Sequence, residues 1–413
     1  IDQEKVLNFT FNGQILKGYE GDTLASALLA NNKHLIGRSF KYHRPRGIVT
    51  AGSEEPNAIM EIGNGAYKEP NTRATVTQLY NGLEANSQNH KGPLSFDFMA
   101  ITDFLSPLLG AGFYCKTFMW PKGFWEKFYE PAIRKSAGLG TLSTEADPDT
   151  YDKGFRHCDI LIIGAGATGL SAALTAANSG AKIILADEDF LMGGRLNSET
   201  NEIDGMAGSE WAKKTVAKLG AMENVTLMSD TTVFGAYDHG IYGVIENRAS
   251  EAREDNDKPR QVNWRIYTKR AILCAGATER LIAFGNNDRP GIMFASAVRT
   301  YLNRFAVATG QRISVYTNND DGWKTAKDLN AKGFRVAAVI DSRSISPVMR
   351  VPGAEICMAT DVVDTKGRRA LKSIQLSNGK SIDTDTLAVS GGWNPNLHFT
   401  CHHRGVPKGN EEI

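Results

Sequence analysis

The sequence has few cysteines, and none of them form a pair at the spacing of a metal site. The five cysteines stand singly along the 413 residues, at positions 115, 158, 274, 357 and 401. An odd and scattered set of this kind argues against a disulfide framework. The pattern predicts a reduced, cytoplasmic protein.

Long apolar runs and an excess of one charge are also lacking. No apolar stretch approaches the roughly 20 residues that span a bilayer, and no signal peptide is recognisable. Lysine and arginine number 47 against 46 acidic residues, which leaves a net charge of +1 and no basic field for nucleic acid. We therefore expect neither a membrane nor nucleic acid as a partner. Because the first residue is Ile1, we expect the natural start to precede it.

What the sequence does contain is a dinucleotide-binding fingerprint. An apolar run, Ile160–Ile163, predicts a strand that is buried on both faces. The turn after it is a G-x-G-x-x-G that comprises Gly164, Ala165, Gly166, Ala167, Thr168 and Gly169. Alanines at helical spacing lead to Gly180, and a second apolar strand, Ile183–Ala186, ends on Asp187. Together these segments predict one complete βαβ unit.

Each part of this unit has a physical role in binding a dinucleotide. Gly164 allows the tight turn, Gly166 lets a pyrophosphate approach the backbone, and Gly169 lets the helix pack on the strand. Free amides at the helix N-terminus favour phosphate. Asp187, aided by Glu188, is expected to accept from the adenosine ribose, which favours NAD or FAD over NADP. The alternative is a tightly packed βαβ unit whose turn is empty.

Two further turns belong to the expected site. Gly194 and Arg195 follow the second strand, and we expect this backbone to close over the dinucleotide with Arg195 beside a phosphate. The alternative for this segment is an ordinary turn with an exposed arginine. Ala275 and Gly276 end an apolar stretch, Ala271–Ala277, that is expected to return the chain to the first sheet as a buried strand.

The first 95 residues predict a β-grasp domain without an iron–sulfur cluster. A strand, Leu7–Phe11, an Asn-Gly hairpin turn, a second strand and a capped helix, Leu24–Ala30, open the domain. This order of elements and its amino-acid sequence resemble the two-iron ferredoxin domains, in which the following loop supplies cysteine thiolates to the cluster. Here that loop, Gly37–Asn57, contains no cysteine.

Basic side chains stand in this loop instead. They are Arg38, Lys41, His43, Arg44 and Arg46, interleaved with Phe40 and Tyr42. One interpretation is a contact to a phosphate or to a partner subunit. The other is a solvated loop with two buried aromatic side chains.

Residues 96–155 predict a connecting segment that is rich in aromatic residues. Eight aromatic residues lie between Gly112 and Pro131, namely Phe113, Tyr114, Phe118, Trp120, Phe124, Trp125, Phe128 and Tyr129. Lysines interrupt the stretch, which argues against a membrane span. Aromatic anchors of this density favour a buried contact between domains or subunits, and the alternative is a strap packed on its own chain.

A second βαβ unit, from Ile313 to Asp341, is expected to be empty. Its turn, Thr317–Gly322, lacks two of the usual glycines and carries Asp320 and Asp321 where phosphates would lie. Like charges at that distance repel one another. The sequence thus predicts four parts: a β-grasp domain (1–95), the connecting segment (96–155), a dinucleotide-binding domain (156–290), and a second, degenerate Rossmann-like domain (291–413) truncated at its end. The fold class is therefore α/β and α+β, a β-grasp domain followed by a two-dinucleotide-binding Rossmann architecture.

Several long segments together resemble the α subunit of the heterotetrameric sarcosine oxidases. They include GRSFKYHRPRGIVTAGSEEPNA, FYCKTFMWPKGFWEKFYEP, NDRPGIMFASAVRTYLNRF and SGGWNPNLH. The resemblance implies oxidative demethylation of sarcosine to glycine, a one-carbon unit and hydrogen peroxide. It implies NAD at the first fingerprint of this chain, FAD and covalent FMN in a partner β subunit, and two smaller subunits. Members of that family are longer than this chain and carry a folate-binding C-terminal region that this sequence does not contain.

Two other interpretations stay open. The chain resembles, more distantly, the FAD-binding subunits of opine oxidase and hydrogen cyanide synthase systems, which would place FAD rather than NAD at the fingerprint. It is otherwise a non-catalytic scaffold with a vestigial nucleotide site. No catalytic base, nucleophile or substrate cage can be assigned, so the catalytic residues are unknown and no metal ligand is proposed.

We predict that the purified chain holds no iron–sulfur cluster, because the loop Gly37–Asn57 offers no thiolate to the metal. Assays for iron and for acid-labile sulfide should both give far less than one equivalent per chain. Stoichiometric iron together with sulfide would contradict the prediction.

Overall fold

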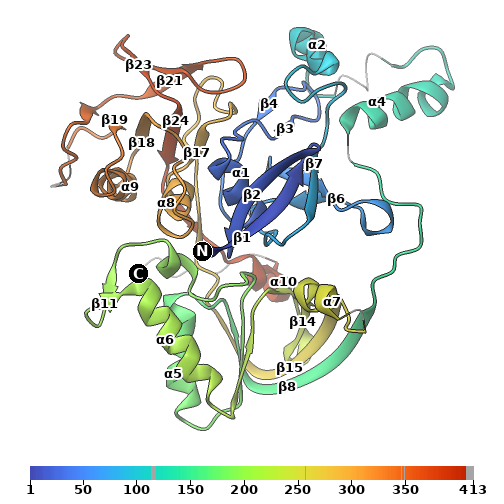
Figure 1. Ribbon diagram of the computed structural model, residues 1–413, viewed down its shortest axis with the longest axis vertical. Coiled ribbons are helices and arrows are strands. Elements are labelled where there is room, and N and C mark those ends of the chain that lie inside the picture. The colour runs from blue at the N-terminus through green and yellow to red at the C-terminus, as the bar shows by residue number, and fades with distance from the viewer. Residues whose placement is uncertain (113–117, 139, 256, 346, 348, 406–413) are drawn as a thin grey trace. The chain divides into compact units, whose positions relative to one another are not determined.

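The computed structural model describes residues 1–112, 118–138, 140–255, 257–345, 347 and 349–405. Its contacts divide the chain into two units that are each discontinuous in sequence (Figure 1). Unit 1 comprises Ile1–Asp147 and Arg280–Gly392, and unit 2 comprises Pro148–Glu279 and Trp393–Ile413. The domain boundaries expected near residues 95, 155 and 290 stay predictions. Of the aromatic segment, Phe113 and Tyr114 lie outside the described residues.

Unit 1 begins with a five-stranded sheet in the order β2-β1-β7-β5-β6. Its strands are β1 (Asp2–Phe11), β2 (Gln14–Glu20), β5 (Ile59–Ile62), β6 (Glu69–Arg73) and β7 (Leu83–Ser87). Asn12 and Gly13, both at positive φ, close the β1–β2 hairpin, and β1 pairs in parallel with β7. Helix α1 (Leu24–Ala30) begins where the Thr23 hydroxyl accepts from the Ser26 amide, and residues 24–29 are buried. The expected β-grasp opening is therefore confirmed.

A parallel sheet in the order β17-β24-β18-β19-β20 follows in the same unit. Its elements are β17 (Ile292–Phe294), α8 (Ala295–Asn303), β18 (Ile313–Thr317), α9 (Asp320–Ala331), β19 (Val336–Asp341), β20 (Glu355–Met358) and β24 (Thr386–Ser390). A small antiparallel sheet joins it, formed by β21 (Val362–Lys366), β22 (Ser373–Leu376) and β23 (Ser381–Asp383). The expected second βαβ unit is thus present.

The β-grasp sheet and the second parallel sheet share one hydrophobic core. Phe9, Leu28 and Met60 of the first belong to the same buried cluster as Tyr301 and Trp323 of the second. The Tyr301 hydroxyl donates to the Thr50 carbonyl at 2.8 Å, which satisfies the only polar atom of a fully buried ring. These two parts of the chain therefore pack as one body.

Short elements surround the β-grasp sheet. They are β3 (Gly37–Arg38), β4 (Pro45–Arg46), α2 (Ile101–Phe104), α4 (Glu130–Ala137) and the helical turns η1 (Gly65–Tyr67), η2 (Phe98–Ala100), η3 (Ser106–Leu108) and η4 (Trp125–Tyr129). Here one interpretation is wrong, that of a solvated loop with two buried aromatic side chains. Phe40 of the basic loop is exposed while Arg38 and His43 are buried, because polar partners, not aromatic packing, hold this loop.

The described part of the aromatic segment is not packed on its own chain. Trp120 is 81% exposed, and Phe124, Trp125 and Phe128 are also exposed. The rings contact one another instead, as where Phe124 stacks on Phe128 with centroids 4.8 Å apart. The interpretation of a strap buried against its own chain is therefore wrong for these residues.

Unit 2 is built on a six-stranded sheet in the order β12-β9-β8-β15-β14-β13. The strands are β8 (Tyr151–Ile163), β9 (Ile183–Ala186), β12 (Val225–Met228), β13 (Thr231–Tyr237), β14 (Ile241–Asn247) and β15 (Gln261–Leu273). Strands β12, β9, β8 and β15 pair in parallel. Strands β14 and β13 extend the sheet beyond β15 in antiparallel pairing. The buried strand expected at 271–277 is wrong in its limits and in its burial. Strand β15 ends at Leu273, Ile272 is exposed, and Gly276 turns away at a φ of 64°.

Helices and short strands complete unit 2. They are α5 (Ala167–Ala177), α6 (Gly208–Gly220), α7 (Ala249–Glu254), α10 (Cys401–Arg404), η5 (Gly194–Asn197), η6 (Asp238–Gly240), η7 (His398–Thr400), β10 (Glu202–Ile203), β11 (Met206–Ala207), β16 (Ala277–Glu279) and β25 (Trp393–Pro395). Helices α5 and α6 lie side by side over one face of the sheet (Figure 1), where Ala173 and Ala212 are fully buried. No helix in the described ranges has the length and apolar character needed to cross a membrane.

Candidate dinucleotide site

The fingerprint turn lies at the carboxyl end of β8, which has β9 on one side and β15 on the other. In parallel sheets of this kind, ligands bind outside the carboxyl ends of the strands. The turn begins at Gly164, whose amide donates to the Ala186 carbonyl of β9 at 2.8 Å. The sheet therefore positions the turn directly through a backbone hydrogen bond.

The three fingerprint glycines differ in what a side chain at each position would meet. A side chain at Gly164, where φ is +99°, would overlap the Cys274 carbonyl. A side chain at Gly169 would overlap the Gly164 carbonyl, so α5 can approach the turn only with glycine at that position. A methyl group at Gly166 would meet nothing within 4 Å. Two glycines thus permit close backbone packing, and the third faces open space.

The N-terminus of α5 has a backbone suited to an anion. Gly166 is the N-cap residue, no side chain caps the helix, and its first turn holds no acidic residue. Ala167 and Thr168 begin the helix, so their amides lie at its positive end. A helix start of this kind binds phosphate through its amides.

Asp187 braces the turn. Its carboxylate accepts from the Ala165 amide and, at 2.9 Å, from the Asp189 amide, and the residue is only 9% exposed. Burial is the main reason that its pKa is raised to about 6; the two amides oppose the rise, and the charges of Asp189 and Glu188 add to it. The ribose contact expected of Asp187 and of the exposed Glu188 stays a prediction.

The second glycine pair lies against the fingerprint. The Gly193 amide donates to the Ala165 carbonyl at 3.0 Å, and a side chain on Gly194 would come within 2.9 Å of the Gly166 backbone. Arg195 stacks on the Trp393 ring, with its guanidinium carbon 3.9 Å from the centroid, and pairs with Glu199 at 2.5 Å. Trp393 and Glu199 therefore hold Arg195 in place, and its position beside a phosphate stays a prediction.

Sequence reasoning missed the residues that reach this site from the far end of the chain. The Asn396 side chain donates to the Ala275 carbonyl at 2.9 Å, and its amide donates to the Gly276 carbonyl at 3.0 Å. Strand β25 pairs antiparallel with β16 just beside them. The short segment Trp393–Asn396 gives no periodic signal, and its neighbours in sequence belong to the second parallel sheet, so nothing pointed to this return.

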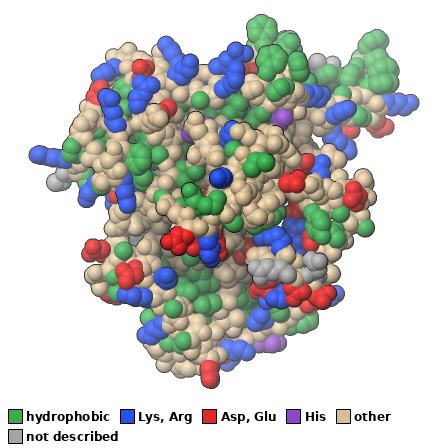
Figure 2. Space-filling view, in the orientation of Figure 1, with side chains coloured by type: hydrophobic (Ala, Val, Ile, Leu, Met, Phe, Trp, Pro, Cys, Tyr) green, Lys and Arg blue, Asp and Glu red, His purple; other side chains and the backbone are tan. Residues whose placement is uncertain are grey.

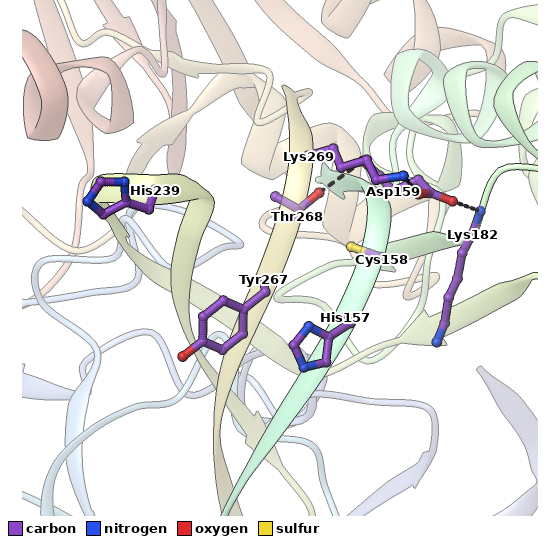
Figure 3. Close-up of a pocket in the computed structure, with 8 residues that line it drawn as sticks. All are labelled: His157, Cys158, Asp159, Lys182, His239, Tyr267, Thr268 and Lys269. Atoms are coloured by element: carbon purple, nitrogen blue, oxygen red, sulfur yellow. Dashed lines mark hydrogen bonds and ion pairs between the residues drawn. The ribbon is translucent and has the colours of Figure 1, made fainter.

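A different cavity of unit 2, drawn in Figure 3, lies away from the fingerprint turn. Its residues lie in the middle of β8 and β15 and before β9, away from the fingerprint end of those strands. Asp159 accepts from the Lys182 amide at 2.8 Å and pairs with Lys269 at 2.7 Å. Burial raises the pKa of the Cys158 thiol, which disfavours the nucleophilic thiolate.

The polar side chains in the turn of the second βαβ unit contact other residues of the chain. Asn319 caps α9 by accepting from the Asp321 amide at 2.9 Å. Asp320 pairs with Arg343 at 2.9 Å, and Asp321 lies 3.4 Å from Arg299. These contacts support the expectation of an empty turn, which stays a prediction.

Two family models match parts of the chain. Residues 4–90 match the 2Fe-2S iron-sulfur cluster binding domain family, and residues 159–251 match the FAD dependent oxidoreductase family. The first cofactor does not fit, since residues 4–90 contain no cysteine. The second match covers the turn whose open Gly166 and uncapped helix fit a dinucleotide. The chain therefore has a ferredoxin-like domain and a dinucleotide-binding domain of the Rossmann type.

Longer relatives match nearly the whole chain. It is 50% identical over 411 residues to the sarcosine oxidase subunit alpha of Rhizobium meliloti (strain 1021), covering 98% of this chain and 42% of the relative. It is 33% identical over 423 residues to that of Corynebacterium sp. (strain U-96), covering 98% and 39%. The chain thus spans about two fifths of the length of these relatives. The resemblance to the α subunit is confirmed.

A solved structure shows the same fold. The crystal structure of L-proline dehydrogenase from P. horikoshii superposes with a TM-score of 0.63 at 19% identity, covering 96% of this chain and 62% of that one. The ferredoxin-like domain followed by a dinucleotide-binding architecture is therefore an arrangement that a known protein also has.

We predict that two glycine substitutions affect different properties, dinucleotide binding at Gly166 and stability at Gly169. Gly166→Ala, at a φ of −71°, should change the free energy of unfolding by no more than about 1 kcal/mol, yet weaken dinucleotide binding by on the order of tenfold or more. Gly169→Ala should cost roughly 1–3 kcal/mol of stability, since the methyl group overlaps the Gly164 carbonyl. Urea unfolding and titration with NAD and with FAD measure both. Equal losses of stability in the two variants would contradict this assignment.

We also predict that dinucleotide affinity falls as the pH is lowered through about 6. The pKa of Asp187 is raised to about 6, so the carboxylate that accepts from a ribose is lost below that value. Stability changes in the opposite sense: the Asp187 contribution is present below about pH 4 and is lost as the pH rises through about 6. Titrations with NAD at a series of pH values test the first sign and urea unfolding over the same pH range tests the second, with Asp187→Asn as the control in both. An affinity in Asp187→Asn that still changes with a midpoint near 6 would argue against the role.

Proposed function

We propose that this chain is the NAD-binding part of the α subunit of a multi-subunit sarcosine oxidase, an oxidoreductase that acts on CH–NH donors. The observation that carries the proposal is the open, uncapped fingerprint turn in a chain 50% identical to a sarcosine oxidase subunit alpha. In this proposal sarcosine is demethylated to glycine, and peroxide forms on a flavin in the partner β subunit, which carries FAD and FMN. Two smaller subunits complete an assembly in the cytoplasm, as the cysteine usage predicts.

The residues of this chain bind and orient the dinucleotide. The amides after Gly166 receive the pyrophosphate, and Asp187 accepts from the ribose while it keeps the turn in place through the Ala165 amide. The Gly194 backbone lies close to the Gly166 backbone beside the turn. A bound dinucleotide of this class supplies a hydride acceptor or donor, while the chain supplies binding and orientation.

A second candidate is an FAD-binding subunit, as in the opine oxidase-like alternative. The match of residues 159–251 to the FAD dependent oxidoreductases favours it. The absorption spectrum of the purified protein separates the two, since a flavin absorbs visible light and NAD does not.

We propose that the partner subunit covers an aromatic surface of unit 1. This surface is formed by Phe98 and Phe104 around α2 and by Trp120, Phe124 and Phe128 around η4. Figure 2 shows hydrophobic side chains gathered over α2 and beside α4. Contiguous exposed apolar patches mark interaction sites, and aromatic side chains are the most frequent anchors of subunit interfaces. The exposed Phe40 of the basic loop is, in this proposal, also a contact to the partner subunit.

We predict that the isolated chain forms no peroxide from sarcosine and oxygen, because the proposed flavin is in the partner subunit. Adding the flavin-containing β subunit and the two smaller subunits should restore peroxide formation. Peroxide made at full rate by the isolated chain would contradict the proposal, and so would a tightly bound flavin in it. Mass spectrometry of the nucleotide released on denaturation identifies NAD or FAD directly.

A further inference from the structure

A cavity of about 640 Å³ lies in unit 1, beside the loop that carries cysteines in ferredoxin domains. Five arginines line it, and they are Arg38, Arg44, Arg289, Arg368 and Arg369. They come from segments far apart in sequence: β3 and the residue before β4, the stretch before β17, and the turn between β21 and β22. Neither the fingerprint nor the proposed reaction uses this cavity.

Two of these arginines are held by carbonyl groups. Arg38, only 7% exposed, donates to the Leu94 carbonyl at 2.7 Å and 3.1 Å and to the His43 carbonyl at 3.2 Å. Arg289 donates to the Thr365 hydroxyl at 3.1 Å and to the Gly367 carbonyl. Within the described ranges, neither guanidinium forms an ion pair with a carboxylate. Both guanidinium groups are therefore held in place mainly by neutral oxygen acceptors.

The acidic residues of the cavity do not cancel this charge. Only three line it, against five arginines, and they are Asp97, Asp103 and Asp288. Asp288 pairs with Arg44 at 2.9 Å and also with Arg46, which lies outside the lining. Asp97 accepts from His43 Nδ1 at 2.6 Å, while His43 Nε2 faces the Ser136 carbonyl at 3.1 Å. Both ring nitrogens of His43 therefore face oxygen atoms, and one carboxylate oxygen of Asp97 is engaged by this ring.

Arg368 and Arg369 add exposed positive charge at the mouth. They follow Gly367 in a turn whose φ of 142° requires glycine, and Arg289 holds that turn through the Gly367 carbonyl. Burial lowers the pKa of Arg38, and the nearby Arg368 and Arg369 lower it further while Asp97 opposes them. A concave site with an excess of one charge concentrates ligands of the opposite charge.

We propose that this cavity binds the phosphate group of a small phosphorylated molecule. Guanidinium groups match phosphate geometry through paired N–H donors and keep their charge at all physiological pH values. The volume is in the range of small-molecule sites, roughly 300–1,000 Å³, so it admits a phosphate together with its organic body. The loop that bears cysteines in ferredoxins thus has an anion site at its place in this chain.

The test is calorimetric titration of the full chain with ribose 5-phosphate, inorganic phosphate and ribose. Ribose 5-phosphate should bind, ribose should not, and affinity should fall as salt is raised. Inorganic phosphate binding as tightly as ribose 5-phosphate would identify a free phosphate as the ligand. Binding of ribose alone, or no heat from either phosphate at millimolar concentrations, would overturn the proposal.

Two double variants locate the binding. Arg368→Gln/Arg369→Gln removes two exposed arginines of the lining and should weaken ribose 5-phosphate binding by roughly tenfold or more, as expected for lost charge-assisted contacts. Arg335→Gln/Arg350→Gln makes the same change in net charge in unit 1, at exposed positions that do not line the cavity, and should bind as the parent does. Gly166→Ala should leave this binding unchanged, since the fingerprint is in the other unit. Equal affinity in the two double variants, or loss only in Gly166→Ala, would contradict the assignment.

Discussion

The dinucleotide site depends on how closely the first turn of α5 approaches the end of β8. Gly169 packs against the Gly164 carbonyl, a contact that no larger residue allows. Because of it, the uncapped amides of α5 lie above the turn, Asp187 reaches the Ala165 amide, and Gly194 lies on Gly166. The arrangement therefore depends on close backbone contacts that only small residues allow, together with the Asp187 carboxylate that braces the turn.

Much of this part of the fold could be predicted from the sequence, because its signals are local. The apolar stretches of β8 and β9, the glycines between them and the alanines of α5 all lie within one short βαβ unit. The extra length of β8 could not be predicted, because residues 151–157 alternate weakly and are mostly exposed. They are strand because β15 pairs with them along their whole length, which is a long-range effect.

The rest of the candidate site could not be predicted, for the same physical reason. Trp393 and Asn396 contact Arg195, Ala275 and Gly276 across large separations in sequence, and no pattern in their own neighbourhood announces this. The second role of Asp187, as a brace for the turn, is likewise invisible in a motif. In the N-terminal domain, the absence of cysteine could be recognised from the sequence, but the ion pair between Arg44 and Asp288 could not be predicted.

The return of the chain at Trp393–Asn396 bears on the order in which the protein is made. Unit 2 is interrupted by residues 280–392, which belong to unit 1. During synthesis the six-stranded sheet is complete once β15 has emerged, yet the Ala275 and Gly276 carbonyls acquire their partner only after Asn396 has left the ribosome. These contacts beside the fingerprint therefore form after the sheet. A nascent chain passes through a stage in which all six strands are present and the contacts of Asn396 are still missing.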